Sequence, residues 1–334
     1  MLEMTTRLPW TSTGSSFLEA TAVSRLDTVE KYQLEVQQFV EEANRREVRL
    51  TGDAAVDAEV VHRFNSLFAQ GHQPNRGEVL LAGLMHFAPE FGRGGYRSLP
   101  RSWRALKGWR LRCLARSRRP WPLGVWCSLA WVMWLQGFPR MGVFLMVMLA
   151  HYLRPGEAMS LCHGDLIPPV PGSLTTWALL VCPSHRKMTT KVGVQDDSIA
   201  CDCKWTPWLD KVLPFLADGP ADSCCWNFTY PDFCRQFRLA LKELRMEKQQ
   251  IVPYQARHSG AAIDQARRLR PLAETKKRGR WASDKSVVRY ERHARLGHSA
   301  RLLTPTQLVT ADFAELHFGE LVLGQMPRRQ LPMP

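Results

Sequence analysis

The chain has 334 residues, with 45 Lys and Arg against 31 Asp and Glu, which gives a formal net charge of +14 at pH 7. This excess of positive charge favours a polyanionic partner, with nucleic acid as the first candidate and an anionic membrane surface as the second. The nine cysteines lack the regular spacing of a disulfide framework, and residues 1–16 lack the basic-then-apolar block of a secretory leader. A soluble, intracellular protein with free thiols is therefore expected.

The first third of the chain is predicted to form a small, basic and helical unit. Residues 1–24 are polar and rich in Ser and Thr, and we expect them to be disordered. Apolar side chains then recur at helical spacing over residues 29–44, 57–70, 74–91 and 102–116. The last of these segments lies in a run, residues 93–119, that holds ten Lys and Arg and no acidic residue. Ser102 is the predicted N-cap of that helix.

The remainder is predicted to be helical around a small β-rich patch. Helices are predicted at residues 123–136 and 141–153, strands at 175–182 and 192–200, and further helices at 208–217, 230–247, 258–268 and 283–295. We expect the first two helices to be buried in a globular core rather than to cross a membrane, because Gln136 and Pro139 interrupt their apolar run. The predicted fold class is mainly α with a small β-sheet, an α+β chain.

Two cysteine clusters raise the question of a zinc site. They are Cys201-Asp202-Cys203 and Cys224-Cys225. A Cys-x-Cys pair followed by two adjacent cysteines does not have the usual spacing of zinc ligands. We therefore predict that the chain uses no metal and no cofactor.

Beyond residue 150, separate segments carry residues suited to cleaving a phosphodiester. They are Leu153-Arg154-Pro155-Gly156-Glu157, Tyr254-Gln255-Ala256-Arg257-His258, Gly279-Arg280-Trp281 and Arg289-Tyr290. Cleavage by transesterification needs a nucleophile, fixed donors for the charge on the non-bridging oxygens, and a proton for the departing 5′-oxygen. Arginine suits the second role because its planar guanidinium donates two parallel hydrogen bonds to phosphate and stays charged. A tyrosine hydroxyl, with a pKa of ~10, needs a cationic pocket and a proton acceptor to act as a nucleophile.

In order and spacing, these segments resemble the active-site boxes of the tyrosine recombinases, the phage-integrase family. The resemblance implies that Arg154 and Arg257 are the catalytic arginines and that Glu157 supports the turn at Arg154. It also implies that Tyr290 is the nucleophile, which forms a 3′-phosphotyrosyl bond, and that Trp281, nine residues earlier, donates to a phosphate oxygen. The amino-acid sequences of residues 258–264 and 278–281 resemble recombinases of eukaryotic mobile elements more than those of phages.

Two positions of this resemblance leave alternatives open. The family's catalytic lysine, which protonates the leaving 5′-oxygen, lies in a hairpin where Lys187 and Lys191 compete; Lys191 is favoured because Lys191-Val192-Gly193 resembles the family's Lys-x-Gly. The family's second box reads His-x-x-Arg-His, and here Tyr254 replaces its first histidine. Because a phenol is a poor base, either Tyr254 only donates to the phosphate, or another group accepts the nucleophile's proton, or turnover is slow.

The resemblance therefore implies a site-specific DNA recombinase or integrase that acts on double-stranded DNA as a homo-oligomer, in the nucleus if the source is eukaryotic. Residues 25–115 would form a helical core-binding domain, residues 116–300 the catalytic domain, and residues 301–334 a tail. One alternative is type IB topoisomerase-like relaxation of supercoils. A second is a catalytically inactive, DNA-binding relic of a mobile element, and a third is a membrane protein that uses residues 121–153.

Overall fold

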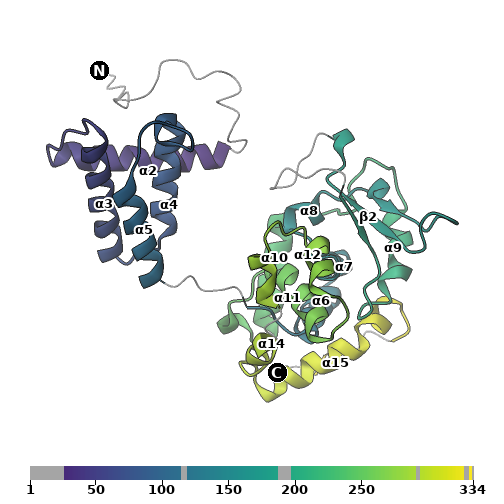
Figure 1. Cartoon of the computed structure of the whole chain (residues 1–334). Helices are drawn as coiled ribbons and strands as arrows, with labels where there is room; N and C mark the ends of the chain where they lie inside the picture. Colours follow the sequence, from purple (N-terminus) through teal and green to yellow (C-terminus); the bar gives the residue numbers. More distant parts are fainter. Residues whose placement is uncertain (1–25, 114–118, 187–196, 291–293, 327–330, 333–334) are drawn as a thin grey trace, which may run out of the picture. The chain divides into compact units, whose positions relative to one another are not determined.

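The computed structural model describes residues 26–113, 119–186, 197–290, 294–326 and 331–332 (Figure 1). Contacts divide the chain into two compact units, Met1–Ser117 and Arg118–Pro334, and each is described by itself. Helices dominate the described residues, and the strands among them form one three-stranded antiparallel sheet in the second unit. The predicted fold class, mainly α with a small β-sheet, is confirmed.

The described part of the first unit is a small helical bundle. Its elements are α2 (Leu26–Arg45), α3 (Asp53–Ala69), α4 (Asn75–Phe87), the 3-10 turn η1 (Pro89–Phe91) and α5 (Pro100–Arg112). α2 packs against α4, and α3 packs against α5. The apolar positions that predicted these helices, among them Phe39, Phe64 and Leu106, meet in one core.

The start of α5 differs from its prediction. The helix begins at Pro100, a favoured first residue because proline has no N–H to satisfy there. Ser102 is therefore inside the helix and buried, and it does not cap it. Asp57 of α3 accepts the free N–H groups of this helix start instead, from Arg101 at 2.9 Å and from Ser102 at 2.7 Å. The capping side chain of α5 thus comes from α3. Sequence periodicity cannot show such a contact between two helices.

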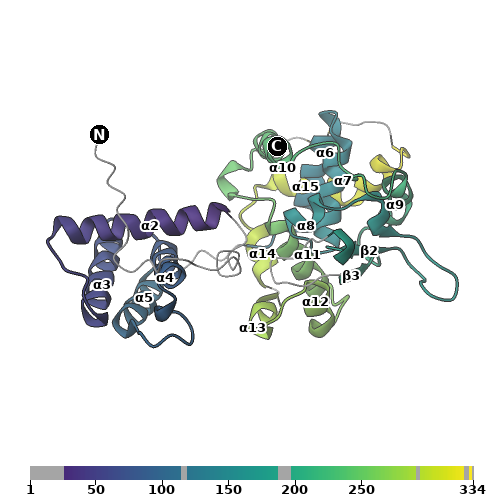
Figure 2. The same cartoon turned by 90° about the horizontal axis from the view of Figure 1, so that it is seen from above.

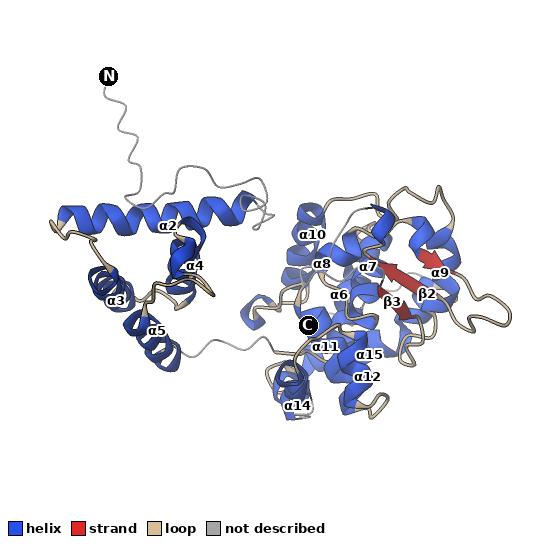
Figure 3. Cartoon of the chain, turned by 45° about the horizontal axis from the view of Figure 1, so that its top comes forward, coloured by secondary structure: helices blue, strands red, loops and turns tan. Residues whose placement is uncertain are grey.

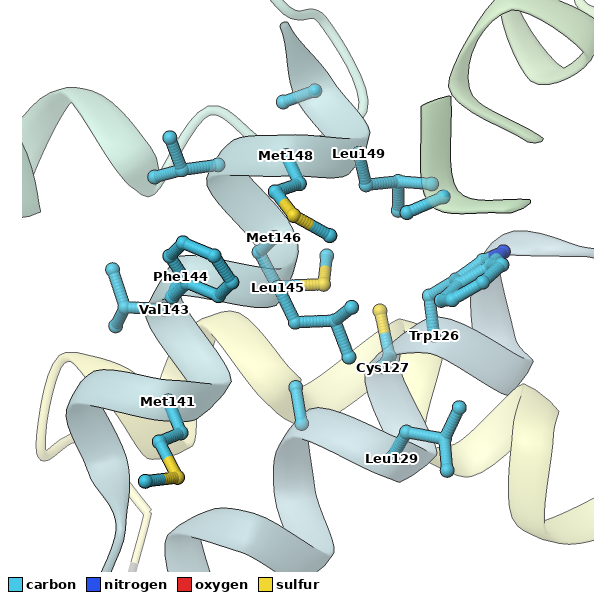
Figure 4. Packing of buried hydrophobic residues seen from close by; sticks show 14 of the residues in the cluster. Trp126, Cys127, Leu129, Met141, Val143, Phe144, Leu145, Met146, Met148 and Leu149 are labelled. Atoms are coloured by element: carbon cyan, nitrogen blue, oxygen red, sulfur yellow. The ribbon is translucent and has the colours of Figure 1, made fainter. Parts of the chain in front are cut away.

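Two apolar helices, α6 (Leu123–Leu135) and α7 (Pro139–Ala150), form the centre of the second unit. They pack against each other, and α6 also contacts α10 (Tyr230–Glu243), α11 (Gln255–Ala266) and α15 (Pro305–Val322). In Figure 4, Cys127 of α6 and Leu145 of α7 point toward one another in this core. Both helices are buried in the globular unit, as predicted. Across the described residues, no helix combines the length and the apolar character needed to span a bilayer.

The sheet is small and lies beside α9 (Leu209–Ala217) at one edge of the second unit (Figures 2 and 3). Its strands are β1 (Leu166–Ile167), β2 (Ala178–Val181) and β3 (Asp197–Ala200), with β2 in the middle. Leu179 pairs with Leu166 on one side and with Ile199 on the other. The second and third strands lie inside the predicted segments; residues 187–196 are outside the described part.

The remaining elements are short. They are α8 (Pro155–Met159), η2 (His163–Asp165), η3 (Ser184–Arg186), η4 (Glu247–Gln249), α12 (Leu272–Arg278), α13 (Asp284–Val287), η5 (Val288–Tyr290) and α14 (Ala294–Ala300). The helix predicted at 283–295 is therefore interrupted, because α13 ends at Val287 and a 3-10 turn follows. Within the predicted tail, residues 305–322 form α15, which packs along α6 in the second unit.

Candidate active site

The first predicted arginine, Arg154, lies where α7 has ended and α8 begins. Pro155 occupies the first position of α8, and the Glu157 side chain reaches back to accept the Arg154 backbone N–H at 2.7 Å. The Arg154 guanidinium pairs with the other oxygen of the same carboxylate. This local motif explains the spacing Arg-Pro-Gly-Glu. Glu157 thus supports the turn at Arg154, the role that the resemblance implied for it.

Glu157 does more than support this turn, because it gathers three arginines of the described residues. Besides Arg154, it pairs with Arg280 through Oε2, and the Arg257 Nη1 lies 3.6 Å from the same oxygen. Burial raises the pKa of the Glu157 carboxyl. Four groups oppose this effect: the Arg280 guanidinium, the Arg154 backbone N–H, and the guanidinium groups of Arg257 and Arg154. Together they outweigh burial and hold the pKa of the Glu157 carboxyl below its ordinary value. The carboxylate is therefore ionised at neutral pH and joins the two predicted catalytic arginines.

The second predicted arginine, Arg257, lies in the first turn of α11 and is buried. Its guanidinium donates to the carbonyls of Tyr152 and Gly279, and so connects the end of α7 to the segment before Trp281. Its Nε–H is buried and has no hydrogen-bond partner among the described residues. Burial lowers the pKa of Arg257 to about 10, an effect that Glu157 opposes and that Arg154 and Arg280 reinforce. At neutral pH the group is still a cation.

The two arginines differ in accessibility. The side chain of Arg154 is 17% exposed and that of Arg257 is 0% exposed. A phosphate can therefore approach Arg154 directly, whereas the Arg257 guanidinium must first be uncovered. In this state Arg257 acts mainly as a connection between segments, and its buried Nε–H keeps a donor without a partner among the described residues.

The backbone around Arg257 is strained at two positions. Tyr152, whose carbonyl Arg257 binds, has φ 50°, and Arg280, which follows the Gly279 acceptor, has φ 52°. Non-glycine residues in this left-handed region cost about 1–3 kcal/mol each and cluster at functional sites. Gly279 is also required by packing, because a Cβ atom there would overlap the Trp281 ring. The glycine thus allows the indole to fold back toward Arg257.

The predicted nucleophile, Tyr290, lies at the end of η5 and is 3% exposed. Its hydroxyl is hydrogen-bonded to Nδ1 of His258. Trp281 contacts it, with 5.0 Å between ring centroids, and the same Trp281 ring lies 4.8 Å from the guanidinium carbon of Arg257. Trp281 therefore contacts both the phenol of the predicted nucleophile and the guanidinium of a predicted catalytic arginine.

Tyr254, which replaces a histidine of the family pattern, is the N-cap residue of α11. It precedes His258 by four residues, which is about one helical turn, so both side chains lie on one face of the helix. Their ring centroids are 5.3 Å apart. Tyr254, His258 and Tyr290 thus form a continuous aromatic series, because the His258 ring also stacks on Tyr290 at 5.9 Å.

The lysine prediction lies outside the described residues, since both Lys187 and Lys191 fall in 187–196. The described element before these residues is η3, and the one after them is β3, which contacts the site through Arg280. Arg186 of η3 pairs with Asp165, and Asp197 of β3 lies 3.6 Å from Arg280 Nε. The choice between the two lysines stays open.

Two residues of the site were not assigned roles from the sequence, His258 and Arg280. Each is adjacent to a predicted residue, His258 after Arg257 and Arg280 before Trp281. His258 reaches the Tyr290 hydroxyl, and Arg280 pairs with Glu157. For His258 the available signal was its match to the last histidine of the His-x-x-Arg-His box, and for Arg280 it was its charge and its position before Trp281. The pattern gave no partner for either.

A second buried ionic network holds α11 in place behind the site. Asp264 accepts from Arg270 Nε at 2.9 Å, from Trp205 Nε1 at 2.7 Å and from the Tyr152 hydroxyl. Arg270 also pairs with Asp202 at 2.6 Å. The network fixes the positions of α11 and the end of α7, and therefore of Arg257 between them.

Among the described residues, no group of three or more His, Cys, Asp or Glu side chains is arranged to hold a metal ion. The cysteines considered for zinc are free thiols, with Cys201, Cys203 and Cys225 buried and Cys224 exposed. Among the described residues, the positive charge of the site comes from arginine side chains.

A scan against models of known protein families finds no match for this chain. A search among curated proteins likewise finds no similar sequence.

Proposed function

We propose that this chain cuts and rejoins double-stranded DNA through a 3′-phosphotyrosyl intermediate, with Tyr290 as the nucleophile. The observation that carries the proposal is the contact of Trp281 with both Tyr290 and Arg257, while Arg257 and Arg154 share Glu157. Residues 154, 257 and the pair 281 and 290 come from three separate segments of the chain, so the contacts among these segments are not a result of local structure. Exchange between two sites needs a homo-oligomer, because each Tyr290 cuts one strand.

The proposed reaction is an in-line displacement at phosphorus. The Tyr290 oxygen forms a new P–O bond while the bond to the 5′-oxygen breaks, and the attack of a 5′-hydroxyl on the phosphotyrosine reverses the step. Arg154 and, once uncovered, Arg257 would stabilise the negative charge on the non-bridging oxygens. A preorganised donor of this kind contributes about 3–4 kcal/mol to the transition state. Lys191, by the family resemblance, would protonate the departing 5′-oxygen.

A suicide substrate tests this proposal. It is a nicked duplex from which cleavage releases a short oligonucleotide, so that religation cannot occur and the covalent complex accumulates. We expect a protein–DNA complex that survives denaturing electrophoresis, with the DNA attached to the peptide that contains Tyr290. The absence of such a complex, with duplex binding retained, would instead identify a DNA-binding relic. If the complex forms, strand exchange between paired sites and relaxation of a supercoiled plasmid separate a recombinase from a topoisomerase.

The exposed side chains of α5 favour DNA as the partner of the first unit. Arg101, Arg104, Lys107 and Arg112 are exposed, and Trp103 beside them is 46% exposed. Basic side chains that contact phosphates set affinity and its dependence on salt, and do not select sequence. The helix therefore offers a row of cations to a phosphate backbone.

Replacement of Arg104 and Lys107 by Gln is expected to weaken duplex binding equally for all sequences. The slope of log affinity against log salt should fall by about 0.9 for each phosphate that the variant no longer neutralises. Fluorescence anisotropy at several salt concentrations measures both effects. Arg110→Gln is the matched control, because Arg110 on the same helix already pairs with Glu78 at 2.9 Å. An unchanged slope in the double variant would remove α5 from the DNA interface.

A further inference from the structure

The hydrogen bond between His258 and Tyr290 identifies a proton acceptor for the reaction proposed above. We infer that Nδ1 of His258 takes the hydroxyl proton of Tyr290 as the phenolic oxygen attacks phosphorus. This inference rests on the proposed function and adds a catalytic residue to it. It also accounts for the tyrosine at position 254, where the family pattern has a histidine.

The position of His258 on α11 is what allows this role. Residues 254 and 258 are separated by about one helical turn and lie on the same face. The last histidine of the His-x-x-Arg-His box matches His258, so the chain keeps a histidine on the side of the helix where Tyr254 replaces the first one. The His258 ring contacts Tyr254 on its own helix and stacks on Tyr290 of η5 with an interplanar angle of 28°.

The proton transfer balances without any further reactant. With its own proton on Nε2, the neutral imidazole has a lone pair on Nδ1 that accepts the Tyr290 O–H; this tautomer is the one that the transfer requires. As the P–O bond forms, the O–H bond breaks and the ring becomes an imidazolium. In the rejoining step the imidazolium returns the proton to the leaving phenolate. The departing 5′-oxygen takes its proton from a different group.

Several ionisable groups surround this histidine. Tyr254 and Tyr290 face its ring, and Arg257 is its neighbour on α11. α14, which also packs against α11, carries Arg295 and His298. A pH profile must therefore be compared between variants at position 258, since other groups also titrate near the site.

His258→Gln is the decisive variant, because glutamine can still hydrogen-bond the Tyr290 hydroxyl but cannot take up its proton. We expect the rate of covalent complex formation on the suicide substrate to fall by about 10²–10⁴-fold, the usual contribution of general base catalysis. The wild-type rate should fall on acidification, over the range where imidazoles become protonated, and this limb should be lost in the variant. Added imidazole should partly restore His258→Ala, an effect that a purely structural role would not produce.

The matched control is His317→Gln, a histidine of α15 that bonds Glu320 at 2.8 Å and should leave the rate unchanged. Circular dichroism and thermal melting check that each variant is folded. If wild type forms the complex and folded His258→Gln forms it at the same rate with the same pH profile, His258 is not the base while the proposed function stands. If wild type forms no complex, both proposals fail.

A second and independent observation concerns Cys162 and Cys224, which lie opposite each other in an isolated antiparallel bridge. The flanking hydrogen bonds run from His163 N to Ser223 O and from Cys225 N to Leu161 O, each 3.0 Å long. The cysteines are therefore a non-hydrogen-bonded pair, whose Cα atoms are about 4.5 Å apart. That separation falls within the range of about 4.4–6.8 Å found for disulfides. The geometry points to a cross-strand disulfide that forms on oxidation.

The two thiols have different exposure, which sets the order of events. Cys224 is exposed and can react with hydrogen peroxide to a sulfenic acid, releasing one water. The buried Cys162 thiol then displaces a second water from that sulfur and forms the S–S bond, so two thiols are oxidised and one peroxide is reduced. Burial raises the pKa of Cys162, and the Arg186 guanidinium, with Nη1 2.6 Å from its Sγ, acts in the opposite direction.

Peptide mapping of the full chain tests this pair. After peroxide treatment and alkylation without reductant, we expect residues 162 and 224 in one linked peptide that separates when a dithiol reductant is added. Cys224→Ser should abolish the linked peptide, and Cys234→Ser, which alters a half-buried cysteine of α10, should not. Recovery of both peptides with alkylated thiols after peroxide treatment would overturn the proposal.

Discussion

Replacement of Tyr290 by phenylalanine is expected to abolish the covalent protein–DNA complex while duplex binding is retained. The change removes only the hydroxyl, so the ring can keep its contacts with Trp281 and His258. No other atom of the residue can attack phosphorus, so the loss should be complete rather than partial. The absence of the hydrogen bond to His258 should destabilise the fold by about 1 kcal/mol. Denaturing electrophoresis of the suicide-substrate reaction measures the complex, and anisotropy measures binding.

Two further phenylalanine variants test whether loss of the covalent complex is specific to Tyr290. Tyr254→Phe removes the other phenol that contacts His258, and Tyr230→Phe alters a tyrosine of α10 that packs on Phe233. Both should still form the complex. If Tyr290→Phe forms the complex and Tyr254→Phe does not, the nucleophile is Tyr254 and the assignment of Tyr290 is wrong.

Much of the fold could be predicted because its helices carry clear periodicity. The apolar faces of α2, α3 and α4 recur every three to four residues, and α6 and α7 are apolar on every side because they are buried on every side. Elements of a few residues, such as α8 and β1, have too few positions to show a period. The break between α13 and η5 was missed because helical spacing continues through both.

The candidate site could be predicted only in part, because a resemblance to a family names candidate residues and not what they contact. Arg154, Arg257, Trp281 and Tyr290 could be named, and the structure brings them into one chain of contacts. That Arg257 donates to two backbone carbonyls could not be predicted, since every residue has a carbonyl and only tertiary packing selects among them. The pairing of Glu157 with Arg280, 123 positions away, depends on packing in the same way.

The largest expected effect on stability comes from Glu157→Gln, because the carboxylate stands among three guanidinium groups of the described residues. Arg257 and Arg280 are 0% and 4% exposed, so water cannot replace the missing negative charge. Removal of one partner from a buried ion pair costs about 3–5 kcal/mol. For a unit of this size that corresponds to a fall in Tm of about 10 °C. Calorimetry measures the change, and the rate of covalent complex formation should fall with it, because Arg154 loses its partner.

The pH dependence of the Tm difference between wild type and Glu157→Gln shows whether the stabilisation comes from the charge of the carboxylate or from the packing of the side chain. The folded-state pKa of Glu157 lies below its ordinary value of 4.5, so the ionised carboxylate stabilises the fold above pH 4.5. That contribution disappears as the pH falls through the folded-state pKa, and the Tm difference between wild type and Glu157→Gln should narrow there. Glu315→Gln, which removes the partner of Arg267 at a site where the two side chains are 32% and 41% exposed, should cost less than about 1 kcal/mol. A Glu157→Gln variant as stable as this control would show that the three arginines do not depend on the carboxylate, and that Arg154 and Arg257 are held together by other contacts.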